Sequence, residues 1–444
     1  MTKQLACLSV VFLTLAACGD SSSSNCVPAD CTAQCVSSSY STGSCIDGRC
    51  QCSGRDADAD ADDTPRDDGA VDDGRDGEAE ATGHYCAEAS YIWIANTAEG
   101  TLSKLCTLDG IEVGRYITGP QGASGDPSRT SVNLHGEMVV TNRDTTGGPS
   151  SVTKFAAEPE FCRDRDGDTF IDTSTGATDV RPWNEDECML WNTPLNPGGG
   201  SGIGARATAW DGSEDASTGR GGHVWIAAIN TKQIFQLDGE TGEILWQGVA
   251  GIGGYGGVMD GHGNFWLVAM TCTVSGMMGA CALERVNTTT HAIDRFSVPC
   301  GYGITADAQG RIWTSGSTGF GSCVNRFDPE SGESLTYRES GATIFFRGIA
   351  VDNLGSVWVA STTGDVLQIN EADVTRVHTV TGIGPESVVG VAIDFQHNVW
   401  AVSQGGNMAV KINPTTYEFD QYPVGRGPYT YSDMTGYQLR TVIF

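Results

Sequence analysis

Apolar and polar residues alternate in a short unit that recurs along the chain, and residues 348–361, GIAVDNLGSVWVAS, are a clear copy of it. This pattern predicts an apolar strand, a polar turn ending at Gly355 and a second strand centred on Trp358. Uninterrupted copies lie 41 to 47 residues apart, which is the length of one β-propeller blade. We therefore predict an all-β, seven-bladed β-propeller over residues 84–444, whose other second strands centre on Trp93, Val139, Trp225, Trp266, Trp313 and Trp400.

The strand before each central residue should be the innermost strand of its blade, as residues 348–352 illustrate. The blade around Trp93 lacks this strand, because Cys86 directly precedes it. We expect a C-terminal strand, residues 436–443, to pair into that blade, which would close the ring and remove its exposed edges. An insertion at about 158–204 interrupts the spacing, and we place it in the third blade.

The N-terminus carries Lys3 and then an apolar run, which predicts an export signal over residues 1–17 that is too short for a mature membrane span. The segment Leu15-Ala16-Ala17-Cys18 resembles the bacterial lipobox. That resemblance implies lipidation of Cys18, a polar tether over 18–25, and an envelope location at the outer membrane, on its periplasmic side or at the cell surface. An ordinary secretory signal is the alternative.

Residues 26–52 contain six cysteines in a segment too short to bury a useful core, so disulfides must stabilise it. Six cysteines allow 15 pairings. The spacing resembles the defensin-like cystine-stabilised αβ motif, although an EGF-like or unrelated small knot is also compatible with it. The defensin-like resemblance implies the pairs Cys26–Cys45, Cys31–Cys50 and Cys35–Cys52. Because the segment is not cationic, a structural or protein-binding role is favoured over membrane lysis.

The charge of the chain and its remaining cysteines limit which partners and which cellular compartment are compatible with the sequence. Residues 53–83 are rich in Asp, Ala and Gly, which predicts a disordered acidic linker. The net charge of −29 argues against nucleic-acid binding, which needs a basic surface. The high cysteine count indicates an oxidising compartment. Within the propeller the positions favour the pairs Cys86–Cys106, Cys162–Cys188, Cys272–Cys281 and Cys300–Cys323.

The repeats GITADAQGRIWTSG and GIAVDNLGSVWVAS resemble those of virginiamycin B lyase-like (streptogramin lyase) propellers, with NHL-type propellers as more distant relatives, over roughly residues 90–444. In that family a His base begins an inner strand and a metal-holding Glu ends the following strand. Neither residue type occupies those positions here. The resemblance therefore implies the propeller fold and leaves the lyase reaction without its catalytic residues. The alternative to a binding function is a lyase or lactonase-type enzyme that acts at the channel mouth.

The inner-strand starts carry another pattern, because arginines and tyrosines recur there. In a propeller such residues would surround one mouth of the channel, and an arginine fork suits a carboxylate or a phosphate. We expect a small polar or anionic ligand, or a protein loop, at this mouth. The alternative is that nearby acids, such as Asp126, Glu386 or Asp433, neutralise the arginines. The predicted mouth residues are Arg129, Arg206, Tyr255, Tyr302, Arg347 and Arg440.

The insertion carries carboxylates at relative positions 1, 3, 5 and 9 of one loop, a spacing that matches a calcium loop. This loop resembles dockerin and thrombospondin type 3 loops and departs from the EF-hand, having Thr169 at position 6 and Thr175 at position 12. A solvated acidic loop is the alternative. The predicted ligands of a structural calcium ion are Asp164, Asp166, Asp168, Asp172 and the carbonyl of Phe170.

Together these features predict a monomeric, lipid-anchored envelope protein. Its propeller would bind a small ligand or an unidentified protein, and it would touch the membrane only through the anchor.

Overall fold

The computed structural model describes residues 40–46, 49–55, 86, 89–144, 149–196, 202–215, 218–270, 272–274, 277–278, 280–317, 321–340, 344–385 and 387–444. The chain forms two compact units, Met1–Glu80 and Ala81–Phe444. In the first, β1 (Tyr40–Ile46) and β2 (Arg49–Arg55) form an antiparallel hairpin. The side chains that would make the three expected N-terminal disulfides, and the lipidation site Cys18, lie outside the described part.

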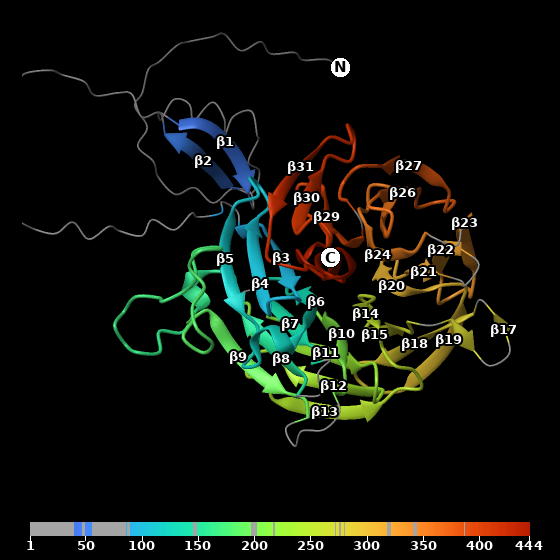
Figure 1. Ribbon diagram of the computed structural model, residues 1–444, viewed down its shortest axis with the longest axis horizontal. Helices are drawn as coiled ribbons and strands as arrows, with labels where there is room; N and C mark the ends of the chain where they lie inside the picture. The colour runs from blue at the N-terminus through green and yellow to red at the C-terminus, as the bar shows by residue number, and fades with distance from the viewer. Residues whose placement is uncertain are drawn as a thin grey trace, which may run out of the picture. The chain divides into compact units, whose positions relative to one another are not determined.

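Seven antiparallel sheets surround a central axis in the second unit, which confirms the predicted propeller (Figure 1). Blade one has three strands, β3 (Tyr91–Asn96), β4 (Thr101–Cys106) and β5 (Glu112–Ile117). Blade two has β6 (Pro127–Val132), β7 (Met138–Asn142), β8 (Ser151–Phe155) and β9 (Met189–Pro194). Blade three has β10 (Ala205–Trp210), β11 (His223–Ala228), β12 (Gln233–Asp238) and β13 (Ile244–Val249).

The other four blades repeat this order of strands. Blade four has β14 (Gly256–Met259), β15 (Asn264–Val268), β18 (Cys281–Asn287) and β19 (Ile293–Val298), with a small hairpin of β16 (Thr273–Val274) and β17 (Met277–Met278). Blade five has β20 (Gly301–Ala306), β21 (Ile312–Ser317), β22 (Gly321–Phe327) and β23 (Ser334–Ser340). Blade six has β24 (Phe346–Val351), β25 (Ser356–Ser361), β26 (Val366–Asn370) and β27 (Arg376–Val380). Blade seven has β28 (Val388–Ile393), β29 (Val399–Ser403), β30 (Met408–Ile412) and β31 (Phe419–Pro423).

A recurrent contact explains the repeated sequence unit. In blade six, the Asp352 carboxylate accepts hydrogen bonds from the backbone N–H groups of Leu354 and Ser356, and it also accepts the indole N–H of Trp358 at 3.0 Å. One aspartate therefore fixes the turn and satisfies a buried indole. The same indole contact recurs between Asp260 and Trp266, Asp307 and Trp313, and Asp394 and Trp400. All seven predicted central residues have 0 % exposure.

The C-terminus closes the ring, but not with the segment that the sequence predicted. Residues 427–434 run beside β3: the N–H of Tyr429 donates to the carbonyl of Ala95, and the N–H of Trp93 donates to the carbonyl of Met434. The predicted strand over 436–443 is wrong, because this segment forms the helix α2 (Tyr437–Ile443). Gly436 turns the chain with a φ of 85°, and the Asp433 carboxylate accepts the N–H groups of Thr435 and Gly436.

Helix α2 lies at the centre of the ring in Figure 1. It packs at the end of the channel where the inner strands finish. Its Tyr437 hydroxyl donates to the carbonyl of Asp352 at 2.7 Å, and its Gln438 side-chain amide donates to the carbonyl of Met259 at 3.3 Å. The helix therefore contacts blades four and six and covers this end of the channel. No helix in the described part of the chain is long and apolar enough to cross a membrane.

The insertion lies in blade two, between β8 and β9, and not in the third blade as expected. Its end supplies β9, the outermost strand of that blade. The short 3-10 helix η3 (Pro159–Phe161) begins it, and a second, η2 (Gly122–Gly125), precedes β6.

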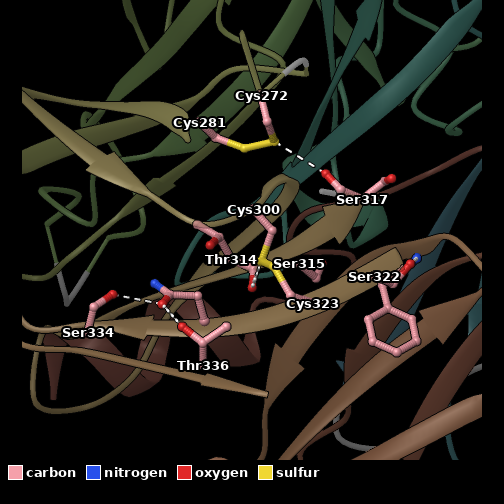
Figure 2. Close-up of a disulfide and its surroundings, with 12 residues drawn as sticks. Cys272, Cys281, Cys300, Thr314, Ser315, Ser317, Ser322, Cys323, Ser334 and Thr336 are labelled. Carbon is pink, nitrogen blue, oxygen red and sulfur yellow. Dashed lines mark hydrogen bonds between the residues drawn. A yellow bond between two sulfur atoms is a disulfide. The ribbon is translucent and has the colours of Figure 1, made fainter. Parts of the chain in front are cut away.

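Four disulfides link the expected partners in the propeller. They are Cys86–Cys106, Cys162–Cys188, Cys272–Cys281 and Cys300–Cys323. Figure 2 shows the last two: Cys272–Cys281 of blade four, with Cys272 beside Ser317 of blade five, and Cys300–Cys323 within blade five, with Cys300 beside Thr314. These bonds fit an oxidising, extracytoplasmic compartment.

Candidate ligand site at the channel mouth

Local irregularities turn the first residues of several inner strands toward the channel. The register shifts in β10 between Ala205 and Ala207, and in β24 between Phe346 and Ile349. These β-bulges contain Arg206 and Arg347, and a similar shift in β6 lies next to Arg129. A bulge leaves a residue unpaired in the ladder and redirects its side chain, and bulges are common beside functional sites.

Five of the six predicted mouth residues come together with two further tyrosines from the closing segment. We call this group the arginine–tyrosine cluster: Arg129, Arg206, Arg347, Tyr255, Tyr302, Tyr429 and Tyr431. The prediction that Arg440 also lies at this mouth is wrong, because Arg440 is on α2 at the opposite end of the channel. Its assignment depended on the strand that the structure replaces with a helix.

The arginines of the cluster stack on tyrosine rings. The guanidinium carbon of Arg206 lies 4.0 Å from the ring centroid of Tyr255, and that of Arg129 lies 4.2 Å from the ring of Tyr431. Arg129 is 1 % exposed and Arg206 is 5 % exposed. Stacking on an aromatic face supports a buried cation, but it leaves the in-plane N–H groups free to bind an acceptor.

The tyrosine hydroxyls form a connected network around Tyr429. The Tyr429 oxygen lies 3.1 Å from the Tyr255 oxygen, 3.0 Å from the Tyr302 oxygen and 3.1 Å from Nη2 of Arg206. Tyr431 extends the network, since its hydroxyl lies 2.7 Å from that of Tyr302 and accepts from Nη1 of Arg347 at 3.3 Å. Sequence reasoning missed both tyrosines, although the alternation in Tyr429-Thr430-Tyr431 is a strand pattern that could have located the closing segment.

None of the three arginines forms an ion pair with a carboxylate among the described residues. Asp126 instead pairs with Arg143 at 2.6 Å, and Asp433 is occupied at the start of α2. Glu386, the third acid considered, lies outside the described residues. Several buried donor atoms therefore lack a hydrogen-bond partner in the described part of the chain: Nε and Nη2 of Arg129, Nε of Arg206 and Nε of Arg347.

The electrostatics reflect this excess of positive charge. Burial and the nearby Arg206 guanidinium lower the pKa of Arg129 to about 10. Burial opposes ionisation of Tyr429, but the Arg206 charge and hydrogen bonds from Tyr255 and Tyr302 outweigh it and lower the pKa of Tyr429 to about 7. The pKa values of Tyr255 and Tyr302 are raised, chiefly by burial. The cluster thus favours a negative charge at its centre.

The strand positions where the lyase resemblance implies catalytic residues carry other side chains. No described inner strand begins with His, and the second strands end with Asn96, Asn142, Ala228, Val268, Ser317, Ser361 and Ser403. Asn96 and Asn142 have matching structural roles, because each donates to two hydroxyls on the next strand of its blade.

The acidic loop of the insertion brings three of its predicted calcium ligands together. Asp164, Asp166 and Asp168 are exposed, and each offers a carboxylate oxygen within 4.8 Å of the others. Asp172 is not in this group, since its carboxylate pairs with Arg181 at 3.1 Å. Three convergent carboxylates are the ligand type that a hard divalent cation prefers.

No protein-family model and no curated protein sequence matches the chain. Among solved structures, a streptogramin B lyase aligns with a TM-score of 0.50 and 14 % identity, over 71 % of this chain and 87 % of that one. A catalytically inactive virginiamycin B lyase from Staphylococcus aureus, solved with quinupristin, aligns with a TM-score of 0.46 and 14 % identity, over 67 % and 84 %. AztD from Citrobacter koseri aligns with a TM-score of 0.45 and 14 % identity, over 77 % and 96 %. The first of these likenesses shows that the chain shares the propeller fold of a streptogramin B lyase, as the repeats predicted.

Proposed function

We propose that this protein is an envelope-anchored binding propeller that captures a small anion, or an anionic group of a partner protein, at the arginine–tyrosine cluster. The observation that carries the proposal is the set of buried arginine N–H groups with no acceptor among the described residues. Burying a cation without a partner costs several kcal/mol. A carboxylate or phosphate would supply the missing acceptors, and the guanidinium geometry suits both.

The half-buried members of the cluster set how a ligand would enter. Arg347 and Tyr429 are partly exposed, whereas Arg129, Arg206 and Tyr431 are buried. A ligand would therefore meet Arg347 first and then reach the inner donors by displacing Tyr429 from Arg206. This proposal assigns binding and no chemical step to the cluster.

Two further parts complete the proposal. Lipidation of Cys18 would hold the protein at the membrane, and the acidic linker would separate the propeller from it. A calcium ion bound by Asp164, Asp166 and Asp168 would stabilise the insertion in blade two.

The test is calorimetric titration of the full chain with phosphate, sulfate and citrate. Arg347→Ala should weaken the binding by about tenfold or more, because a hydrogen bond to a charged group contributes about 1.5–3 kcal/mol. Arg376→Gln is the matched control, since it removes an arginine charge from the exposed outer strand β27, away from the channel. Equal binding by wild type and Arg347→Ala, or no binding of any of the three anions, contradicts the proposal.

A further inference from the structure

Blade one leaves a gap that a turn fills in other blades. In blades four to seven, a short aspartate-capped turn leads from the inner strand to the tryptophan strand. Blade one has no such turn, because its inner segment comes from the C-terminus and leaves the sheet at Met434 to enter α2. The space beside Trp93 remains as a cleft of about 460 Å³. This volume is in the range of small-molecule sites, roughly 300–1,000 Å³.

Four elements supply the walls of this cleft. Tyr91 and Trp93 come from β3, Leu134 and His135 from the turn after β6, and Phe395 from the turn after β28. Helix α2 adds Arg440. The lining is about half polar, and Leu134 and Phe395 are the large apolar side chains that reach its surface, so it suits a small ligand with one apolar face and one polar end.

Two side chains at the cleft, Arg440 and His135, carry N–H groups that a ligand could engage. Arg440 is exposed, and its guanidinium carbon lies 5.5 Å from the ring centroid of Phe395. Within the described residues, neither the Arg440 guanidinium nor the His135 imidazole has a side-chain hydrogen bond or an ion pair. Arg440 sits on a helix that Tyr437 and Gln438 fix to the inner strands, so its backbone is held in place.

We propose that this cleft is a second ligand site, which binds a small carboxylic acid with a flat apolar body, such as an aromatic acid. The carboxylate pairs with Arg440 and accepts a hydrogen bond from His135, while the ring lies against Leu134 and Phe395. The site is at the opposite end of the channel from the arginine–tyrosine cluster and does not depend on the function proposed for that cluster.

The experiment is saturation-transfer NMR and calorimetry on the full chain with benzoate and phenylacetate, and with benzyl alcohol as the uncharged probe. We expect both acids to bind and benzyl alcohol to bind about tenfold or more weakly, since it lacks the charge. Arg440→Gln should weaken benzoate binding by a similar factor. Phe395→Ala, which removes the ring beneath the guanidinium but keeps the charge, should also weaken it.

Arg347→Gln tests whether benzoate binds at the channel mouth instead, and Arg376→Gln, on the exposed outer strand β27, is the charge-matched control that should leave benzoate binding unchanged. Thermal unfolding of each variant shows whether it has folded. Arg440 is exposed and Arg347 is partly exposed, so both arginine positions should tolerate glutamine. Three results overturn the proposal: no binding of either acid, equal binding by wild type and Arg440→Gln, or loss of binding in Arg347→Gln alone. The last result would assign the acids to the arginine–tyrosine cluster.

Discussion

Tyr429 is the residue on which the arginine–tyrosine cluster converges. Its oxygen lies within hydrogen-bond distance of two tyrosine hydroxyls and of Arg206, whose buried charge has no carboxylate partner among the described residues. A phenolate at this position would act as a counter-ion inside the protein. An external anion would then compete with Tyr429 for the same guanidinium group.

We predict that one tyrosine titrates near pH 7 and that Tyr429→Phe abolishes this titration. The folded pKa of about 7 lies below the ordinary value of 10.0. The stabilisation from ionised Tyr429 is therefore complete above pH 10 and is lost as the pH falls through about 7. The ultraviolet absorbance of tyrosinate, followed against pH, measures the titration. Tyr422→Phe is the control and should leave it in place, because burial raises the pKa of Tyr422.

Phosphate binding to wild type should also weaken as the pH rises above 7, by up to about tenfold per pH unit, as Tyr429 ionises. In Tyr429→Phe this part of the pH dependence should vanish. A steep dependence that persists in the variant would show that another group, or phosphate itself, causes it.

The recurrent element is the aspartate-capped turn that joins an inner strand to a tryptophan strand. Asp352 makes three hydrogen bonds to residues no more than 6 positions away, two with the turn and one with the indole of Trp358. This local geometry explains why Asp, Gly and Trp recur at fixed spacing. Blade one, which has no turn at this position, is also the blade beside the cleft.

We predict that Asp352→Ala lowers the free energy of unfolding of the propeller by about 3 kcal/mol, since it leaves the buried Trp358 N–H without an acceptor. Asp373→Ala, in an exposed turn of the same blade, should change it by about 0.5 kcal/mol or less. Urea unfolding followed by tryptophan fluorescence measures both values. A similar loss in both variants would mean that the indole contact has no special role.

The insertion provides a second prediction for an element. Calcium should raise the midpoint of thermal unfolding of wild type and slow proteolysis between Cys162 and Cys188. Asp166→Ala should lose both effects, because it removes one of three convergent carboxylates. Glu185→Ala, an exposed acid of the same insertion, should keep them. If equilibrium dialysis finds no calcium bound to wild type, the loop is simply a solvated acidic turn.

As a whole molecule, the propeller has a different structure at each end of its channel. The arginine–tyrosine cluster lies where the inner strands begin, and α2 covers the end where they finish. The C-terminal segment contributes to both ends, since Tyr429 and Tyr431 join the cluster and residues 437–443 form the helix. Closure of the ring and assembly of the candidate site are therefore coupled.

At the same scale, we predict that Cys18→Ser releases the full chain from the membrane fraction when it is exported by a bacterium, because the acyl chains proposed on Cys18 would supply the attachment. Cell fractionation and immunoblotting measure this, and mass spectrometry of wild type should show acylation of Cys18. Cys7→Ser, inside the apolar run of the export signal, is the control and should leave the protein attached. Attachment that persists in Cys18→Ser would refute the lipid anchor.

The sequence by itself determined the number of blades, the second strand of each blade and the four propeller disulfides. These features depend on local alternation and turn chemistry that each repeat carries within itself, as around Asp352 and Trp358. Repeat equivalence also predicted that Arg129, Arg206 and Arg347 face one mouth. Only the tertiary structure decided how the ring closes.

Closure joins residues that are far apart, as the 303-residue separation of Arg129 and Ser432 shows. No local pattern specifies such a pairing. For the same reason, the apolar residues of 436–443 are compatible with a strand or a helix until Asp433, Gly436 and the channel wall select the helix. That selection moves Arg440 away from the mouth, brings Tyr429 into it, and leaves the cleft beside Trp93.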